Sequence, residues 1–282
     1  MFTILDAQPL APNVMRLKVE APLVARKRQA GQFVIVRVTE TGERIPLTIC
    51  DASRREGTIT LVVLAVGKTT RLLCQLRPGD RIQDVVGPLG RPTPMERFGS
   101  VACVGGGVGT AELYPIATAL RAMGNKVHSI IGARSKSLVI LEREMRSCSD
   151  ALVITTDDGS YGEPGLVTGS LRALLDGPFA IQAVYAIGPL AMMKEISKLT
   201  MPYGTRTWVS LNTIMMDGTG MCGGCRVSIG GEMKFACVDG PEFDGHQVDF
   251  DELMRRNNAY RDLEQLAVGQ DGLGHRACNA GG

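Results

Sequence analysis

The stretch VACVGGGVGTAELYPIATALRAMGNKVHSIIGA, residues 101–133, decides the fold of this 282-residue chain. A short apolar run leads into a glycine loop, a segment of helical length follows, and a second apolar run closes the stretch. Two strands that are joined by a helix in this way form a βαβ unit, whose strands lie parallel in one sheet. The sequence therefore predicts a parallel α/β domain around these residues.

Strand and helix patterns alternate onward to residue 211. The apolar runs ALVITTDDG (151–159), AVYAIG (183–188) and TWVSLN (207–212) predict strands. Helices are expected around residues 138–146, 166–175 and 190–199. The resulting sheet has about five strands, which is too few for a TIM barrel. We assign residues 98–211 to one α/β domain.

The glycine loop is suited to a nucleotide diphosphate, because bare backbone amides and the start of a helix favour an anion. Thr110 stands where a strict G-x-G-x-x-G motif has its third glycine, and the second strand ends in GARSK without an acidic residue. A tight turn without a ligand is the alternative. Arg134 and Lys136 could meet a ribose phosphate or only solvent, so they do not decide between NAD and NADP. The predicted contacts are Gly105, Gly106, Gly107, Val108, Gly109 and Arg134.

Residues 1–97 have a different pattern, with short runs of alternating hydrophobicity. These runs are MRLKV (15–19), QFVIVRV (32–38) and TITLVVLAV (58–66), and turn signals such as ETGE and RPGD separate them. Period-two runs at this spacing predict a small antiparallel barrel. GPLG at 87–90 is expected to be a turn.

Two short motifs in the barrel suit a flavin. RIPLT (44–48) combines a cation, a rigid proline and a hydroxyl, and VGKTT (66–70) follows a strand with a glycine, a cation and two hydroxyls. Each motif alone would be an ordinary strand end. Upstream of a nucleotide domain, they predict an FAD held by its ring edge and its diphosphate. The expected contacts are Arg44, Pro46, Leu47, Thr48, Gly67, Lys68, Thr69 and Thr70.

The segment MMDGTGMCGGCRVSIGGEMKFACVDG (215–240) carries three cysteines with the spacing of a metal or cluster site. Cys222 and Cys225 have two residues between them, and Cys237 follows after eleven more. Zinc requires four ligands, for which His246 is the nearby histidine. Plant-type ferredoxins have the spacing C-x4-C-x2-C followed by a later cysteine. Counting back five positions from Cys222 gives Asp217.

The site is therefore expected to be a 2Fe-2S cluster on Asp217, Cys222, Cys225 and Cys237, within a loop domain at 212–248. In the alternative, Asp217 only forms an Asp-Gly turn and Cys278 completes the site. The remaining cysteines, at 50, 74, 103 and 148, lie among apolar neighbours and are expected to be buried thiols. A polar C-terminal tail occupies residues 249–282, with some helical spacing.

The composition excludes several classes of function. Lys and Arg total 31 against 29 Asp and Glu, and a net charge of +2 is too small for a nucleic-acid-binding surface. No run reaches the ~18 apolar residues that a spanning helix needs. We expect a cytoplasmic protein without a membrane or nucleic-acid partner.

These pieces, in this order, resemble the ferredoxin-reductase-like electron-transfer subunits, which combine a flavin barrel, a nucleotide domain and a 2Fe-2S loop. RIPLT and VGKTT resemble the flavin motifs of that family, and GGGVG with IGPLAMMK (187–194) resembles its nicotinamide domain. TTDDGSYGEPGLVT (155–168) is similar to its third-strand loop. The resemblance implies that Asp158, Gly188 and Pro189 also belong to the NAD(H) site.

Two subgroups of this family are relevant. The dihydroorotate dehydrogenase electron-transfer subunits normally have four cluster cysteines. The small subunits of NADH-dependent reduced ferredoxin:NADP+ oxidoreductases have an aspartate first and typically contain MVDGTGMCG, from which MMDGTGMCG (215–223) differs at one position.

The second resemblance implies a larger glutamate-synthase-like, NADPH-binding iron-sulfur flavoprotein partner, with ferredoxin engaged indirectly by electron bifurcation. It requires no catalytic side-chain acid or base, because the cofactors do the chemistry. A dihydroorotate-type subunit and a non-catalytic assembly subunit without flavin are the alternatives.

Overall fold

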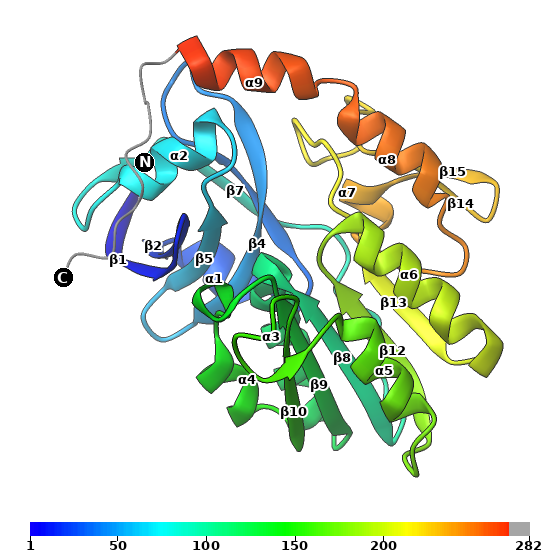
Figure 1. Ribbon diagram of the computed structural model, residues 1–282. Helices are drawn as coiled ribbons and strands as arrows, with labels where there is room; N and C mark the ends of the chain where they lie inside the picture. Colours follow the sequence, from blue (N-terminus) through cyan, green and yellow to red (C-terminus); the bar gives the residue numbers. More distant parts are fainter. Residues whose placement is uncertain (271–282) are drawn as a thin grey trace.

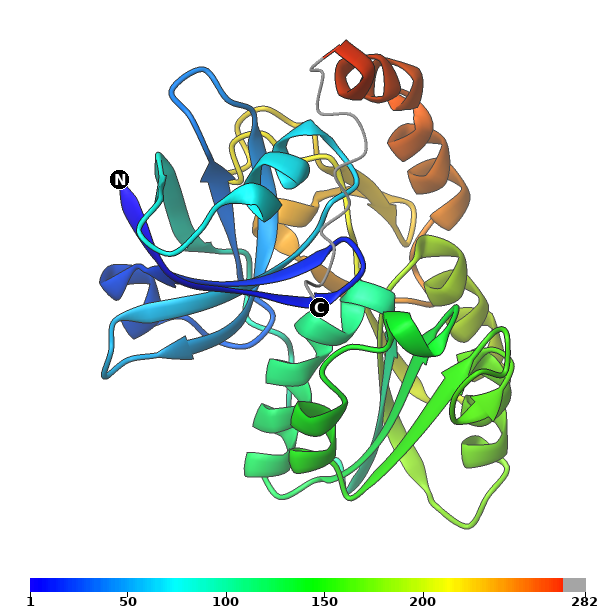
Figure 2. The same ribbon diagram turned by 60° about the vertical axis from the view of Figure 1, so that its left-hand side comes forward.

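A computed structural model describes residues 1–270 of the chain. It contains two large sheets and one small one, and in both views the blue-to-cyan barrel lies above the green α/β region (Figures 1 and 2). The yellow and orange segments lie beside both. Within residues 1–270, none of the helices combines the length and the apolar composition that crossing a membrane requires.

The first sheet has seven antiparallel strands in the order β6-β1-β2-β5-β4-β3-β7. Its alternating side chains bury one face, so Leu17, Val19, Ile59 and Leu61 have no exposed surface. The predicted barrel is confirmed. Its elements are β1 (Phe2–Ala11), β2 (Val14–Glu20), α1 (Pro22–Lys27), β3 (Phe33–Arg37), β4 (Arg44–Ser53), β5 (Thr58–Leu64), α2 (Lys68–Gln75), β6 (Arg81–Ile82) and β7 (Asp84–Leu89).

The expected turn at 87–90 is wrong, because most of GPLG belongs to β7, where Leu89 pairs with Phe33. Glycine and proline favour turns locally, but an edge strand tolerates a proline. Strand pairing at the sheet edge therefore determined the structure of this segment, although its glycine and proline favour a turn.

The second sheet has seven strands in the order β11-β10-β9-β8-β12-β13-β16. The five predicted parallel strands lie side by side in it, with β11 and β16 added at the two edges. Its strands are β8 (Ser100–Gly106), β9 (Lys126–Ala133), β10 (Ala151–Thr156), β11 (Glu163–Pro164), β12 (Ile181–Ile187), β13 (Arg206–Ser210) and β16 (Glu242–Asp244).

Helices cover both faces of this sheet. Side chains of α3 and α4 pack with Val101 and Cys103, whereas those of α5 and α6 pack with Ala102 and Val104, so successive residues of β8 serve opposite faces. These are the layers of a doubly wound α/β sheet. The helices and 3-10 turns are η1 (Gly107–Gly109), α3 (Thr110–Ala122), η2 (Lys136–Leu138), α4 (Glu142–Ser147), α5 (Val167–Leu175), α6 (Leu190–Thr200) and η3 (Met201–Tyr203).

After β13 the chain leaves the sheet, forms the cysteine loop and returns as β16, which pairs antiparallel with β13. Between them lie the hairpin β14 (Arg226–Ile229) and β15 (Glu232–Phe235), followed by the short helix α7 (Ala236–Asp239). The tail then forms α8 (Phe250–Asn258) and α9 (Arg261–Gln270), which runs across the top of Figure 1 towards α2. The divisions at residues 97, 211 and 248 stay a prediction.

The loop after β10 provides a matched test of close packing. Gly159 and Gly162 have φ values of +69° and +68°, but a Cβ on Gly162 would lie 2.1 Å from the backbone oxygen of Ile154. A Cβ on Gly159 would meet only Pro164, at 3.4 Å. We expect Gly159→Ala to cost about 1–2 kcal/mol of unfolding free energy from the left-handed backbone alone. Gly162→Ala should cost a further ~1–3 kcal/mol from overpacking.

Denaturant unfolding of the two variants measures this difference. Equal losses of stability would show that the loop moves away from Ile154 freely.

Candidate functional site

The two barrel motifs lie next to each other. RIPLT begins β4, where Arg44 is exposed and Pro46, Leu47 and Thr48 are half-buried. The Thr69 hydroxyl donates to the carboxylate of Glu43, directly before Arg44, at 2.9 Å. Backbone amides of Val66 and Gly67 donate to the Thr70 hydroxyl at 3.0 and 2.9 Å, so Thr70 holds the turn before α2.

The barrel motif also contacts the nucleotide domain. Thr48 Oγ1 donates to Glu112 Oε2 at 3.2 Å, and Glu112 lies in the first turn of α3, directly after the glycine loop. An apolar contact that includes Cys50, Val62, Ala111 and Leu141 supports this junction. The predicted flavin and nucleotide motifs are thus brought to one interface.

The glycines of the loop have different roles. A Cβ on Gly109 would lie 2.4 Å from the oxygen of Ile187, and one on Gly188 would lie 3.1 Å from the Gly106 backbone. These three glycines therefore permit close packing between the loop and the end of β12. Gly107 has φ of +55°, and an added Cβ would meet nothing within 4 Å, which leaves backbone accessible for a ligand.

Arg134 and Asp158 lie on neighbouring loops at the ends of β9 and β10, and both side chains are exposed. The Asp158 amide donates to the Arg134 oxygen at 3.2 Å. The Asp158 carboxylate accepts from the amide and the hydroxyl of Ser160, and these bonds lower its pKa. Asp158 therefore shapes its own loop, and a nucleotide contact at this residue stays a prediction.

The cysteine loop gathers two of its three thiols. Sγ of Cys225 and Sγ of Cys237 lie 3.2 Å apart, and both residues are 1% exposed. Burial, followed by the Cys225 thiol, raises the pKa of Cys237 to about 12. Thiols bind iron as thiolates, so a bound cluster would displace these protons. Cys222 is exposed on the same loop.

Asp217 heads the loop as an ordered carboxylate. It accepts from the Thr219 amide at 3.0 Å and from the Cys222 amide at 2.9 Å, and the Thr219 bond is the main cause of its lowered pKa. Its ionised form can bind iron. The Asp-Gly turn and a ligand role are thus compatible, since both amides hold the carboxylate beside Cys222.

Within residues 1–270, no three His, Cys, Asp or Glu side chains converge on a position for a single metal ion. His246 Nε2 is instead 2.9 Å from the Thr200 hydroxyl.

The cysteine loop packs closely on the barrel, because a Cβ on Gly218 would lie 2.7 Å from Leu89 and 2.8 Å from Ile35. Cys278 lies outside the described residues.

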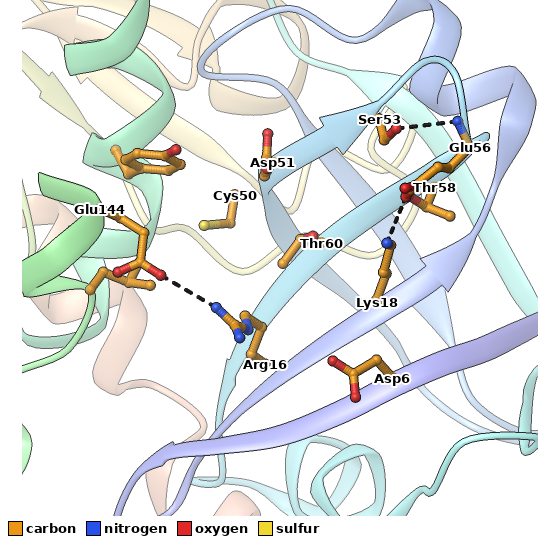
Figure 3. A pocket seen from close by; sticks show the side chains of 12 residues that line it. Asp6, Arg16, Lys18, Cys50, Asp51, Ser53, Glu56, Thr58, Thr60 and Glu144 are labelled. Atoms are coloured by element: carbon orange, nitrogen blue, oxygen red, sulfur yellow. Dashed lines mark hydrogen bonds and ion pairs between the residues drawn. The ribbon is translucent and has the colours of Figure 1, made fainter. Parts of the chain in front are cut away.

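A separate cavity of about 350 Å³ lies between the barrel strands and α3 and α4 (Figure 3). Ion pairs join Lys18 to Glu56 at 2.6 Å and Arg16 to Glu144 at 3.4 Å. None of the predicted contacts lines this cavity. Its lining is Asp6, Arg16, Lys18, Cys50, Asp51, Ser53, Glu56, Thr58, Thr60, Tyr114, Leu141 and Glu144.

Sequence reasoning missed two acids at the junction, the half-buried Glu112 and the buried Glu242. Glu112 follows the glycine loop by three positions, but an acid in the first turn of a helix is ordinary. Glu242 sits between a proline and a phenylalanine, with no motif around it. Only the pairing of β13 with β16 brings the two together.

The cysteine segment matches a known family. Residues 212–249 match the family model of the iron-sulfur cluster binding domain of dihydroorotate dehydrogenase B. The chain is 48% identical to a Thermotoga maritima protein named dihydroorotate dehydrogenase B (NAD(+)), electron transfer subunit homolog, over 92% of this chain and 91% of that protein. The chain belongs to the dihydroorotate dehydrogenase B electron-transfer subunit family. A Geobacillus thermodenitrificans member, named as the electron transfer subunit itself, is 33% identical over 88% of this chain and 97% of its own length.

Solved structures share the fold of this chain. One of them comes from a structural study of flavin-based electron bifurcation by the NADH-dependent reduced ferredoxin-NADP oxidoreductase. It matches with a TM-score of 0.91 and 44% identity, over 95% of this chain and 96% of that one. Phthalate dioxygenase reductase matches at 19% identity with a TM-score of 0.60, over 81% and 85%, which shows a shared fold. The resemblance and the fold class are confirmed, whereas the individual ligand and cofactor contacts stay predictions.

The first test of these contacts concerns Arg44. We expect Arg44→Ala to lower the FAD content of the purified chain, because it removes the cation of the barrel motif. Arg81→Ala, another exposed arginine of the barrel, is the matched control. Flavin absorbance per chain measures the effect, and full occupancy in Arg44→Ala would remove Arg44 from the site.

A second test concerns the aspartate. We expect Asp217→Cys to keep a 2Fe-2S cluster but to change its electron paramagnetic resonance g-values, because a soft thiolate replaces a harder carboxylate. Cys278→Ser should leave the spectrum as in the wild type. The assignment fails if Asp217→Cys gives the wild-type spectrum while Cys278→Ser destroys the cluster.

Proposed function

We propose that this chain is the small subunit of a bifurcating NADH/NADPH/ferredoxin oxidoreductase. It exchanges hydride between NAD(H) and FAD in the barrel, and it passes single electrons through a 2Fe-2S cluster to a larger subunit. The observation that carries this proposal is the likeness of 95% of the chain to a subunit of the NADH-dependent reduced ferredoxin-NADP oxidoreductase.

A bound flavin can accept two electrons as a hydride and release them one at a time to a cluster, and the cluster can pass these electrons to the partner subunit. The residues of this chain bind and orient these groups. In this proposal, Arg44 and the turn before α2 would hold the FAD, the loop around Gly107 would hold the nicotinamide cofactor, and Asp217 with its three cysteines would hold iron. The hydrogen bond from Thr48 to Glu112 joins the barrel to the nucleotide domain.

The proposed partner is a larger iron-sulfur flavoprotein of glutamate-synthase-like type that binds NADPH. It would exchange electrons with ferredoxin, and this chain would meet ferredoxin only indirectly. Two exposed methionines of the cluster loop, Met216 at 61% and Met221 at 88%, suit a protein contact there. A cytoplasmic location belongs to the same proposal.

A second candidate is the electron-transfer subunit of a dihydroorotate dehydrogenase. The family model of the cysteine segment and the names of several relatives favour it. Asp217 in place of a first cysteine favours the bifurcating enzyme.

Reconstitution separates the two candidates. We expect the isolated chain to reduce artificial acceptors with NADH, because it has sites for a nicotinamide, a flavin and a cluster. It should show no NADPH-linked ferredoxin reduction until the larger subunit is added, and mass spectrometry of the co-purified polypeptide identifies that subunit. NADPH-linked ferredoxin chemistry in the single chain would overturn the proposal, and co-purification with a dihydroorotate dehydrogenase would favour the second candidate.

A further inference from the structure

Two carboxyl side chains lie together where the barrel, the parallel sheet and the return from the cysteine loop meet. Glu112 belongs to the first turn of α3, and Glu242 is the first residue of β16. Glu242 is only 6% exposed, and no basic residue forms an ion pair with either acid among the bonds found in residues 1–270. The function proposed above uses neither group.

Hydroxyl groups connect the two acids to each other and to the barrel. Glu112 accepts from Thr48 at Oε2 and from Ser210 at Oε1. Ser210 is the antiparallel partner of Glu242 in the β13–β16 pair, so their side chains share one face, and its hydroxyl also interacts with Glu242. Ser210 thus lies between the two carboxyls, and Thr48 links them to the predicted flavin motif.

The far side of Glu242 has an unpartnered oxygen. Glu242 Oε1 and Thr93 Oγ1 are both buried, and neither forms a hydrogen bond of good geometry in the described part of the chain, although the Thr93 hydroxyl is near enough to the Glu242 carboxyl to lower its pKa. They face one point, since a Cβ on Gly31 would lie 1.9 Å from Thr93 Oγ1 and 2.8 Å from Glu242 Oε1. A buried carboxylate oxygen without a partner is costly as an anion. A proton on Glu242 removes that cost.

Two neighbouring carboxylates, of which Glu242 is buried and Glu112 half-buried, cannot both stay ionised at low cost. Burial raises the pKa of both, and the neighbouring Glu112 raises the pKa of Glu242 further. Ser210 and Thr48 favour charge on Glu112, and Thr93, Ser210 and a backbone amide favour charge on Glu242. Because the charge of Glu112 also raises the pKa of the more deeply buried Glu242, Glu242 is the protonated member. Other facing groups are Thr93 and Tyr185, whose own pKa burial raises and whose hydroxyl donates to the Pro94 oxygen at 2.6 Å.

A metal ion is the other means of neutralising two acids. No third His, Cys, Asp or Glu joins them in a metal site within residues 1–270. A shared proton therefore accounts for the pair better than a cation.

We propose that Glu112 and Glu242 hold one proton in common and exchange protons with the flavin site through the Thr48 hydroxyl. The exchange with flavin rests on the proposed function, whereas the shared proton does not. When hydride has been delivered and electrons leave singly, the hydride's proton must pass from the flavin to a base. Thr48 Oγ1 takes up that proton and releases its own to Glu112 Oε2, so no electron moves and the pair loses one negative charge. The reverse transfer returns the proton when electron flow reverses.

The shared proton is tested in the full chain with its cofactors bound. A carboxyl with a raised folded-state pKa is protonated in the folded chain at pH values where the unfolded chain releases its proton. Such a carboxyl therefore lowers the free energy of unfolding by an amount that increases as pH rises above about 4.3 and becomes constant above the folded-state pKa. Glu242→Gln removes this cost, so its melting temperature should rise relative to the wild type with increasing pH. Glu195→Gln, on the exposed face of α6, should show a constant difference.

The same outcome for Glu242→Gln and Glu195→Gln would overturn the shared proton. Infrared spectroscopy gives an independent measurement, because a protonated carboxyl has its own carbonyl band. That band should be present in the wild type at neutral pH and absent from Glu242→Gln. Its presence in both proteins would overturn the assignment of the proton to Glu242.

The exchange with flavin is tested by titrating the FAD midpoint potential against pH. The wild-type curve should bend where the pair titrates, and Glu112→Gln should lose this bend. Thr48→Val should keep both the bend and the pH-dependent melting behaviour, because an equilibrium potential does not depend on the proton's route, but it should slow the reoxidation of the flavin by an artificial acceptor, whereas Thr48→Ser should keep the wild-type rate. A wild-type reoxidation rate in Thr48→Val would overturn the exchange through Thr48. A chain that binds no FAD would instead overturn the proposed function, and the melting experiment would still decide whether the proton is shared.

Discussion

The antiparallel pairing of β16 with β13 is the constraint on which the arrangement of this protein depends. Three residue pairs, from Trp208 with Asp244 to Ser210 with Glu242, return the chain to the parallel sheet after the cysteine loop. The intervening loop is therefore closed at both ends by one edge of that sheet. Backbone pairing of this kind satisfies the polar groups of a buried segment and fixes its register.

The closed loop is held from two further directions. On the barrel side, the Arg91 amide donates to the Gly240 oxygen at 2.7 Å, and the absence of a Cβ at Gly218 allows contact with β3 and β7. On the other side, Asn257 of α8 donates to the Asn212 oxygen at 2.8 Å. The cysteine segment is thus fixed against the barrel, the sheet and the tail. Such support is what a cofactor site needs, because small displacements of a redox group or its ligands alter its function.

The same pairing buries an acid where an apolar side chain would have been more stable. Glu242 lies beside Glu112 only because Ser210 is its partner across the β13–β16 ladder. Buried polar groups that lack partners lower stability and occur mainly where function requires them. At this junction of the three parts of the protein, a proton-binding role explains why two acids are kept together.

The sequence by itself determined the larger architecture. The period-two runs before residue 97 and the strand, glycine loop and helix after Val101 are local patterns, and local patterns are governed by side-chain spacing. The spacing of Cys222, Cys225 and Cys237 likewise indicated an iron-sulfur segment, which the family model confirms. The nucleotide contact expected for Asp158 stays a prediction, and in the structure its carboxylate accepts a hydrogen bond from Ser160 in its own loop.

Tertiary structure alone decided how distant residues meet. The strand at 84–89 contradicted a turn signal because a sheet edge was available, and β16 added an edge strand that three residues could not signal. No property of Glu112 or Glu242 in the sequence predicted their contact, because they are separated by most of the nucleotide domain and the cysteine loop. Contacts of this kind depend on the packing of whole elements, which the periodicity of a single segment does not contain.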